Sequence, residues 1–194
     1  MQKPNNYDNT AASGDFTPIT PGGHHLIIKK VEESKTKTDK DMIIVAFDMA
    51  PGDSQPNYFS EKFANDIRPD KKWPRAGRQY IVVTDNDGNT SRSFKTFVTS
   101  VEKSNSGFVT AWGDTFASQF KGKRIGGVFG PVESKYQGKV STRCELRWFC
   151  DDAKTDGARV PDLKALPNNN RIVNAPASND FVSVPDGVDE EIPF

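Results

Sequence analysis

The apolar residues of this chain occur in short runs separated by polar, turn-forming segments, a pattern typical of β-strands. The first two runs span residues 24–33 and 42–49. The second begins Met-Ile-Ile-Val-Ala-Phe and is almost wholly apolar, so we expect this strand to be buried on both faces. Residues 34–41, between the two runs, are polar and contain three lysines, which indicates an exposed loop.

Residues 56–84 have a less regular pattern. Aromatic residues near position 60 are followed by a polar section with two prolines, and then by an apolar run at residues 80–83. This order predicts a strand, an irregular insertion and a further strand. Residues 85–89, Asp-Asn-Asp-Gly-Asn, are turn formers and end this part of the chain.

A helix is predicted after this turn. Four apolar residues recur at i, i+3, i+4 and i+7: Phe94, Phe97, Val98 and Val101. The spacing places them on one face of a helix, which Ser93 is able to cap and Gly107 to terminate. Phe116 and Phe120 are four residues apart and predict a second, short helix after Trp112.

The last two apolar runs, residues 123–133 and 139–150, predict a β-hairpin joined by residues 134–138. Alternation along the second strand divides its side chains between two faces. One set is Thr142, Cys144, Leu146, Trp148 and Cys150, and the other is Arg143, Glu145, Arg147 and Phe149. We expect the first face to join the core and the second to be basic, aromatic and exposed.

The order of these elements predicts a mainly β protein. Three strand regions, a helix and a strand pair match an OB-fold, a five-stranded barrel with one main helix between strands 3 and 4. The predicted OB-fold domain spans residues 23–166. Residues 1–22 are polar and without periodicity, which indicates an N-terminal arm, and residues 167–194 are predicted to be a disordered tail.

Charge is unevenly distributed along the chain. The 194 residues carry 26 basic and 26 acidic side chains. From residue 167 onward there is one basic residue against five acidic ones, so the body carries the compensating excess of positive charge. A basic body with an acidic tail indicates an anionic ligand for the body and a separate role for the tail.

Several classes of protein are not expected. No apolar run approaches the ~20 residues of a membrane span, and no secretory signal is apparent. Cys144 and Cys150 are too far apart along one strand for a disulfide, so we expect reduced thiols and a cytoplasmic protein. His24 and His25 lack the spacing of a zinc site with these cysteines. We expect no metal, no cofactor and no catalysis.

The two loops that bind ligands in an OB-fold correspond to residues 34–41 and 134–138. Basic and aromatic residues occur in and around both loops, as single-stranded nucleic acid requires for its phosphates and bases. The predicted DNA-binding residues are Lys35, Lys37, Lys40, Tyr58, Lys123, Arg124, Lys135, Tyr136, Lys139, Arg143, Arg147 and Phe149.

The last six residues form a distinct motif: Asp189, Glu190, Glu191, Ile192, Pro193 and Phe194. Three carboxylates precede an apolar residue, a proline and a terminal aromatic ring. Such a peptide offers charge to a basic rim and a ring to an apolar pocket, while the proline restricts the unbound chain. The motif predicts a site for partner proteins.

This ending resembles the acidic tip of bacterial and phage single-stranded DNA-binding proteins, typically Asp-Asp-Asp-Ile-Pro-Phe, with Glu190 and Glu191 as conservative departures. Residues 20–166 are similar to the phage-encoded members of that group at several short motifs. These are Pro21-Gly22-Gly23, residues 27–33 and 42–47, Trp73-Pro74, Phe94-Lys95-Thr96-Phe97 and Lys121-Gly122-Lys123. The body does not resemble the standard bacterial protein, so the tetramer and stacking residues of that protein are not implied.

The resemblance implies a protein that coats and protects unwound DNA in the host cytoplasm during phage replication and recombination. It further implies recruitment of the enzymes of those processes through the tip. A homo-oligomer is compatible with the sequence.

Two alternatives stay open. Asp114, Glu133 and Lys135 loosely match the Asp…Glu-x-Lys pattern of Mg²⁺-dependent nucleases, in which two carboxylates hold the metal and the lysine assists the attacking water. The other alternative is a protein-interaction adaptor whose barrel binds no nucleic acid.

Overall fold

The computed structural model describes residues 1–5, 7 and 17–167. Residues 6 and 8–16 of the predicted arm lie outside the described residues. The predicted tail from residue 168 onward, with its six-residue tip, lies outside them too.

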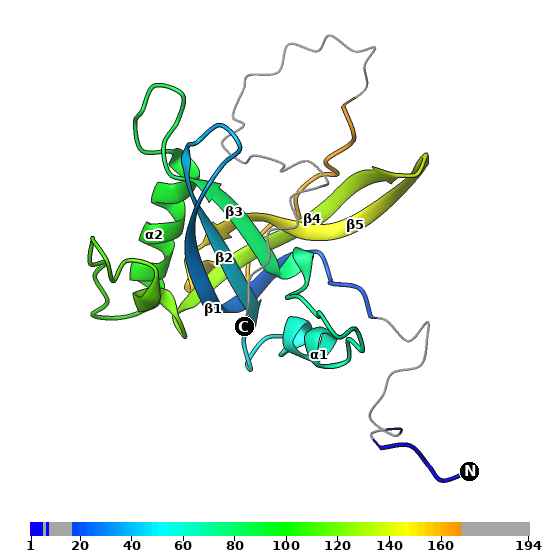
Figure 1. Ribbon diagram of the computed structural model, residues 1–194. Coiled ribbons are helices and arrows are strands. Elements are labelled where there is room, and N and C mark those ends of the chain that lie inside the picture. The colour runs from blue at the N-terminus through cyan, green and yellow to red at the C-terminus, as the bar shows by residue number, and fades with distance from the viewer. Residues whose placement is uncertain (6, 8–16, 168–194) are drawn as a thin grey trace.

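Five antiparallel strands form one sheet, which confirms the mainly β prediction. They are β1 (Gly22–Lys35), β2 (Asp41–Met49), β3 (Arg78–Val82), β4 (Arg124–Tyr136) and β5 (Lys139–Cys150), in the spatial order β3-β2-β1-β4-β5 (Figure 1). Within the described residues, β3 and β5 are the two edges of this sheet, so it does not close into the predicted barrel. β3 has only five residues, and helix α2 (Arg92–Ser104) contacts β3, β4 and β5 where closure would occur.

The prediction of a strand near residue 60 is wrong, because a short helix, α1 (Tyr58–Ala64), occupies this position. A buried carboxylate from β2 explains the difference. Asp48 is 1% exposed and accepts hydrogen bonds from the backbone N–H groups of Phe59 (2.8 Å) and Ser60 (3.1 Å). The first backbone N–H groups of a helix have no partner within the helix, and here Asp48, about ten positions upstream, accepts hydrogen bonds from two of them.

Helix α2 confirms the main helix prediction, and all four residues of its predicted apolar stripe are buried. Its cap is Ser91 rather than Ser93, because the Ser91 hydroxyl accepts a hydrogen bond from the Phe94 N–H at 3.2 Å. The helix ends before Asn105, earlier than predicted, and the Asn105 amide group bonds to the backbone of Arg124 at the start of β4. The second predicted helix is a single 3-10 turn at Ser118–Phe120.

Strand β2 is buried on both faces, as predicted. Ile43, Val45 and Phe47 belong to the main core between the sheet and α2. Met42 and Ile44 point to the other face, where they pack with Tyr80 of β3 in a separate small cluster. The register therefore places Tyr80 and its neighbour by alternation, Arg78, on the outer side of the sheet.

Residues 151–166, which we call the strap, cross the outer face of β1 and β4 after β5 ends. Glycines make room for the strap. A Cβ at Gly23 would lie 2.1 Å from the Thr155 carbonyl oxygen, one at Gly126 would lie 2.8 Å from the Asp151 carbonyl oxygen, and one at Gly130 would contact Pro161 at 2.9 Å. Further along, Lys164 pairs in parallel with Val132 of β4. The sheet and the strap thus pack as one unit.

Replacing Gly23 with alanine tests this packing. The new methyl group meets backbone rather than a movable side chain, so the strap must shift, and we expect Gly23→Ala to lower the free energy of unfolding by about 1–3 kcal/mol. Urea denaturation measures this change. Gly52→Ala is the matched control, because a Cβ there meets nothing within 4 Å. Equal stability of the two variants would contradict the packing.

His25 clamps the strap to β1. Its Nδ1 lies 2.7 Å from an oxygen of Asp152 and its Nε2 lies 3.0 Å from an oxygen of Asp156. Partial burial of the ring disfavours its charge, but hydrogen bonds to these two carboxylates and their negative charge outweigh that effect, so the pKa of His25 is raised. Asp152 also pairs with Arg124 at 3.1 Å.

The clamp predicts a pH-dependent stability. Because the folded pKa of His25 is raised, its contribution is complete below the unfolded value of about 6.5 and is lost as pH rises through the folded value. We expect the stability difference between the native protein and His25→Gln to be larger at about pH 6 than at about pH 8.5. Urea titrations at both values measure it. Asp156→Asn should reduce the dependence, and a difference independent of pH would exclude the clamp.

Candidate nucleic-acid interface

The β4–β5 hairpin extends beyond the other strands as a two-stranded arm (Figure 1). β1 pairs with β4 only along residues 22–27, opposite residues 124–129, so β4 continues past that point with β5 as its main partner. The turn at the end is Gln137-Gly138, both with positive φ (47° and 81°), which is the geometry of a tight two-residue hairpin turn. We call residues 134–143 the hairpin arm.

Residues 134–143 carry three basic side chains and no acidic one, and Glu133 and Glu145 lie directly beyond them on β4 and β5. Lys135, Lys139 and Arg143 are exposed, and within the described part of the chain none of the three forms an ion pair. Tyr136 is 65% exposed at the tip and Val140 is 57% exposed. Tyr136 pairs directly with Lys139, so a ring and a cation share one face of the arm. Cations beside an exposed ring suit phosphates and bases.

Helix α1 lies near the base of this arm and adds a cation that the sequence pattern did not indicate. Partial desolvation and the charge of Arg143 lower the pKa of Lys62. Tyr58 is held differently from the prediction: its hydroxyl donates to the Thr17 carbonyl oxygen at 3.0 Å, and its ring packs edge-on against Phe59. Burial and the nearby Cys144 raise the pKa of Tyr58 to about 12. Its ring is therefore engaged with the protein.

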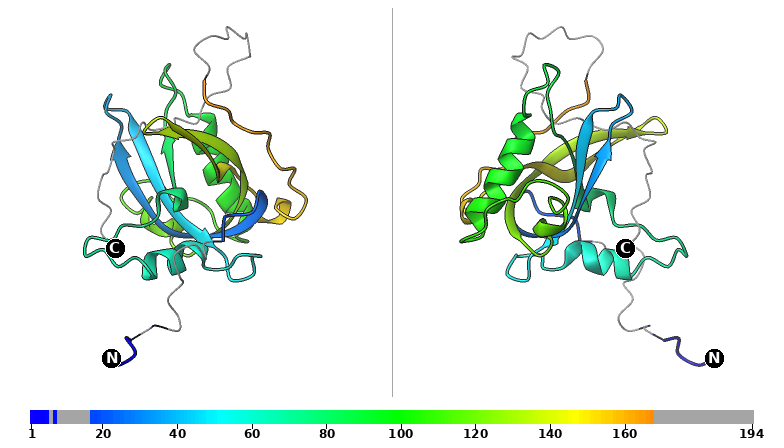
Figure 2. Two further views of the ribbon diagram at one scale, coloured as in Figure 1. Left: turned by 90° about the vertical axis from the view of Figure 1, so that its right-hand side faces the viewer. Right: turned by 60° about the vertical axis from the view of Figure 1, so that its left-hand side comes forward.

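The β1–β2 turn carries the second predicted group of lysines. Lys35 pairs with Asp39 at 3.1 Å and with Asp41 at 3.7 Å, and the Lys40 ammonium donates to the side-chain oxygen of Asn86 at 2.6 Å. Lys37 is exposed on the turn. This turn and the tip of the hairpin arm both extend toward the upper side of the molecule in Figures 1 and 2. The turn is less basic than its lysine content suggests, because Asp39 and Asp41 offset the charge of Lys35.

Lys123 and Arg124 are not part of this group. They lie at the start of β4, and the tip of the arm lies at its end, about 40 Å away at ~3.3 Å per residue. The Lys123 ammonium sits over the Phe108 ring at 4.5 Å, and Arg124 pairs with Asp152. The twelve predicted residues therefore fall into separate regions of the molecule.

Phe149 and Arg147 also differ from the prediction, and one irregularity explains both. The register between β4 and β5 shifts between Val128 and Phe129, so that Trp148 pairs with Val128 and Leu146 with Phe129. This bulge at Arg147 reverses the alternation. Phe149 is therefore in the core at 2% exposed, where it was predicted to be an exposed stacking ring, and Trp148 is 38% exposed.

The Arg147 guanidinium holds the strap rather than pointing to solvent. Its Nη1 donates to the carbonyl oxygen of Asp162 at 2.9 Å and approaches that of Pro131 at 3.4 Å. Its assignment as a DNA contact is accordingly weakened.

The residues of the nuclease alternative lie in separate elements. Asp114 is in the segment between α2 and the turn at Ser118–Phe120, whereas Glu133 and Lys135 are on β4. In Figure 1 that segment and the far end of β4 lie on opposite sides of the view. One oxygen of Glu133 accepts a hydrogen bond from the Leu166 N–H at 3.1 Å. Across the described ranges there is no group of three or more His, Cys, Asp or Glu residues placed to hold a metal.

Both cysteines are free thiols. Burial raises the pKa of Cys144 and of Cys150 to about 11, with neighbouring carboxylates adding to the effect. Both cysteines lie on β5, six residues apart, as predicted.

No known protein-family model and no curated protein matches this chain. Among the helices of the described residues, none has the length and apolar character needed to cross a membrane.

Two aromatic substitutions distinguish the core ring from the surface ring. Phe149→Ala removes a fully buried ring and should lower the free energy of unfolding by about 3–5 kcal/mol. Tyr136→Ala at the arm tip should change it by less than about 0.5 kcal/mol. Urea denaturation measures both, and a large loss at Tyr136 would show that the arm tip packs against the body.

Proposed function

We propose that this protein binds single-stranded DNA without sequence preference through the hairpin arm. The observation that carries the proposal is the concentration of Lys135, Lys139 and Arg143 with Tyr136 on an exposed ribbon that contains no acidic residue. Cations along a groove or ribbon contact phosphates, and an exposed ring stacks on a base, which is worth ~1–3 kcal/mol per base and tolerates any sequence. An unstacked base is needed for this contact, so single strands are favoured over duplex.

The topology supports assignment to the OB-fold. The helix lies between β3 and β4, and β1 pairs with both β2 and β4, as in the partly open five-stranded Greek-key barrel of that fold. In OB-folds the ligand crosses the face of strands 2 and 3 and contacts the β1–β2 and β4–β5 loops. Here the outer face of β2 and β3 presents Tyr80 and Arg78.

Arg78 supports this path for the ligand. Its Nε is buried and has no hydrogen-bond partner. Buried donors of this kind are usually satisfied. The Nε itself is closed to solvent, so the contribution of Arg78 to this path is its positive charge on the outer side of β3.

The proposed cellular role is protection of unwound DNA during replication and recombination in a phage-infected cell, with no catalysis by this chain. The six terminal residues would recruit partner enzymes. The resemblance of these residues to the tips of single-stranded DNA-binding proteins supports this role.

Removing the cations of the hairpin arm tests the proposal. Lys135→Gln, Lys139→Gln and Arg143→Gln combined should weaken binding to oligo-dT, because up to three phosphate contacts are lost. The slope of log K against log[salt] should become shallower by about 0.7 for each contact removed. Fluorescence anisotropy at several salt concentrations measures both quantities.

A matched triple variant controls for the change in net charge. Arg68→Gln, Lys154→Gln and Arg159→Gln remove the same formal charge from residues that pair with Asp66, Asp151 or Asp162 elsewhere on the molecule. We expect its salt slope to match that of the native protein. An affinity that does not change with salt concentration, or a preference for duplex DNA, would contradict the proposal. Absence of any DNA binding would favour the adaptor alternative.

Deletion of residues 189–194 tests the proposed recruitment. We expect DNA affinity to stay the same or to increase at low salt, because negative charge is removed, while binding of partner enzymes is lost. Pull-down from infected cells and anisotropy measure the two effects. Loss of DNA binding on deletion would show that the tip has been assigned the wrong role.

A further inference from the structure

Trp112 is a large exposed aromatic residue in a segment that lies across the view from the hairpin arm in Figure 1. It lies between α2 and the turn at Ser118–Phe120 and is 68% exposed. One face of its ring is occupied, because it stacks on Phe116 with centroids 5.3 Å apart and planes inclined by 14°. Its high exposure leaves the other side of the indole open to solvent.

Hydrogen bonds brace the segment that presents Trp112. The Gln119 amide group accepts from the Ala111 N–H and donates to the Ala111 carbonyl oxygen, both at 2.7 Å, and donates to the Phe116 carbonyl oxygen at 2.8 Å. The Glu102 carboxylate accepts from the Thr110 N–H at 3.0 Å. A ring held in place before binding loses little entropy when a ligand stacks on it.

Lysines occur in the elements around this ring. Trp112 also contacts Phe94, whose neighbour Lys95 is exposed on α2. On the other side, a continuous series of ring contacts runs from Phe116 through Phe120 to Phe108, which lies under the Lys123 ammonium at 4.5 Å. Lys121 is also exposed in the segment that follows α2. The exposed acidic residue of that segment is Asp114.

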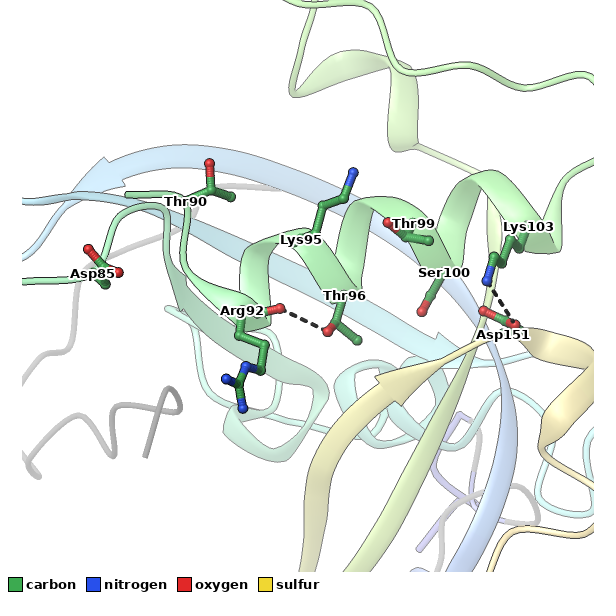
Figure 3. Close-up of a pocket in the computed structure, with 9 residues that line it drawn as sticks. All are labelled: Asp85, Thr90, Arg92, Lys95, Thr96, Thr99, Ser100, Lys103 and Asp151. Atoms are coloured by element: carbon green, nitrogen blue, oxygen red, sulfur yellow. Dashed lines mark hydrogen bonds and ion pairs between the residues drawn. The ribbon is translucent and has the colours of Figure 1, made fainter. Parts of the chain in front are cut away.

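A shallow groove runs along α2, and its charged lining residues are Arg92, Lys95 and Lys103 with Asp85 and Asp151. Figure 3 shows Lys103 paired with Asp151 at 4.0 Å, whereas Lys95 and Arg92 extend from the helix in different directions. Threonine hydroxyls occupy much of the remaining lining. Hydroxyls and cations are common partners of a sugar-phosphate backbone.

We propose that Trp112, together with Lys95, Lys121 and Lys123 of the neighbouring segments, is a second contact for single-stranded nucleic acid, with a base stacked on the open face of the indole. This inference rests on the proposed function. A second copy of the chain fits less well, because a symmetric dimer through this face would bring the same lysines together. The start of β4, where Lys123 precedes Arg124, is separated from the arm tip by about 40 Å measured along β4, so a DNA strand that reaches both contacts has to follow the surface of the body.

Tryptophan fluorescence and two lengths of oligo-dT test the inference. Trp73 is 5% exposed, so in the Trp148→Phe variant Trp112 is the one highly exposed indole. We expect oligo-dT of about 35 nucleotides to quench it, and an oligonucleotide of about 8, within the range of a single OB-fold site, to quench it much less. No quenching by the long oligonucleotide would overturn the inference.

Affinity gives a second readout. Trp112→Ala should weaken binding of the long oligonucleotide by about fivefold or more and leave the short one unchanged, whereas Trp112→Phe should retain most of the affinity. Val109→Ala is the matched control, because Val109 is a 79% exposed apolar residue of the same segment. Equal affinities of native protein and Trp112→Ala for both lengths would overturn the inference.

The remaining outcomes separate the two proposals. If Trp112→Ala abolishes self-association in light scattering and leaves DNA affinity unchanged, the ring is a protein contact and the inference is wrong. If the native protein binds neither oligonucleotide, the proposed function itself is wrong. Binding of both lengths with no role for Trp112 would contradict the second contact alone.

Discussion

The antiparallel pairing of β1 with β4 determines the shape of this protein. β1 is the central strand and holds β2 on one side and β4 on the other, but it covers only the first six residues of a 13-residue β4. Everything beyond that point on β4 has β5 and a short piece of the strap as its partners. Because a two-stranded ribbon has little core to bury, its side chains are free to be selected for contacts with other molecules.

The strap covers the part of the sheet that the hairpin arm leaves behind. It covers the outer face of β1 and β4 where glycines leave no side chains, and His25 and Arg147 hold it at two places. It therefore keeps this part of the sheet away from ligands. Accessible surfaces of the described residues include the outer face of β2 and β3, the hairpin arm, and the segment after α2 that carries Trp112.

Much of the fold could be predicted from local pattern. The buried strand at β2, the apolar stripe of α2 and the hairpin at the end of the body all follow from periodicity and turn residues within single segments. The errors have distant causes. Asp48 starts α1 from another strand, and the bulge at Arg147 moves Phe149 into the core by shifting register against β4. Alternation along one strand contains no information about a bulge that its partner helps to define.

The same distinction applies to the candidate sites. Lysines in a turn are visible in the sequence, but their ion pairs with Asp39 and Asp41 depend on the conformation of the turn. Trp112 carries no periodic signal, and its orientation follows from Gln119 and Phe116.

The hairpin arm ends in a tight turn at Gln137-Gly138, so its length can change by adding or removing cross-strand pairs before that turn. Residues two apart on a strand share a face, so inserting or deleting one cross-strand pair beyond residue 132 would exchange the faces of the tip, whereas two pairs would restore them. Neither change would touch the core. Related proteins could therefore vary the reach of this ribbon in discrete steps while the rest of the sheet stays unaltered.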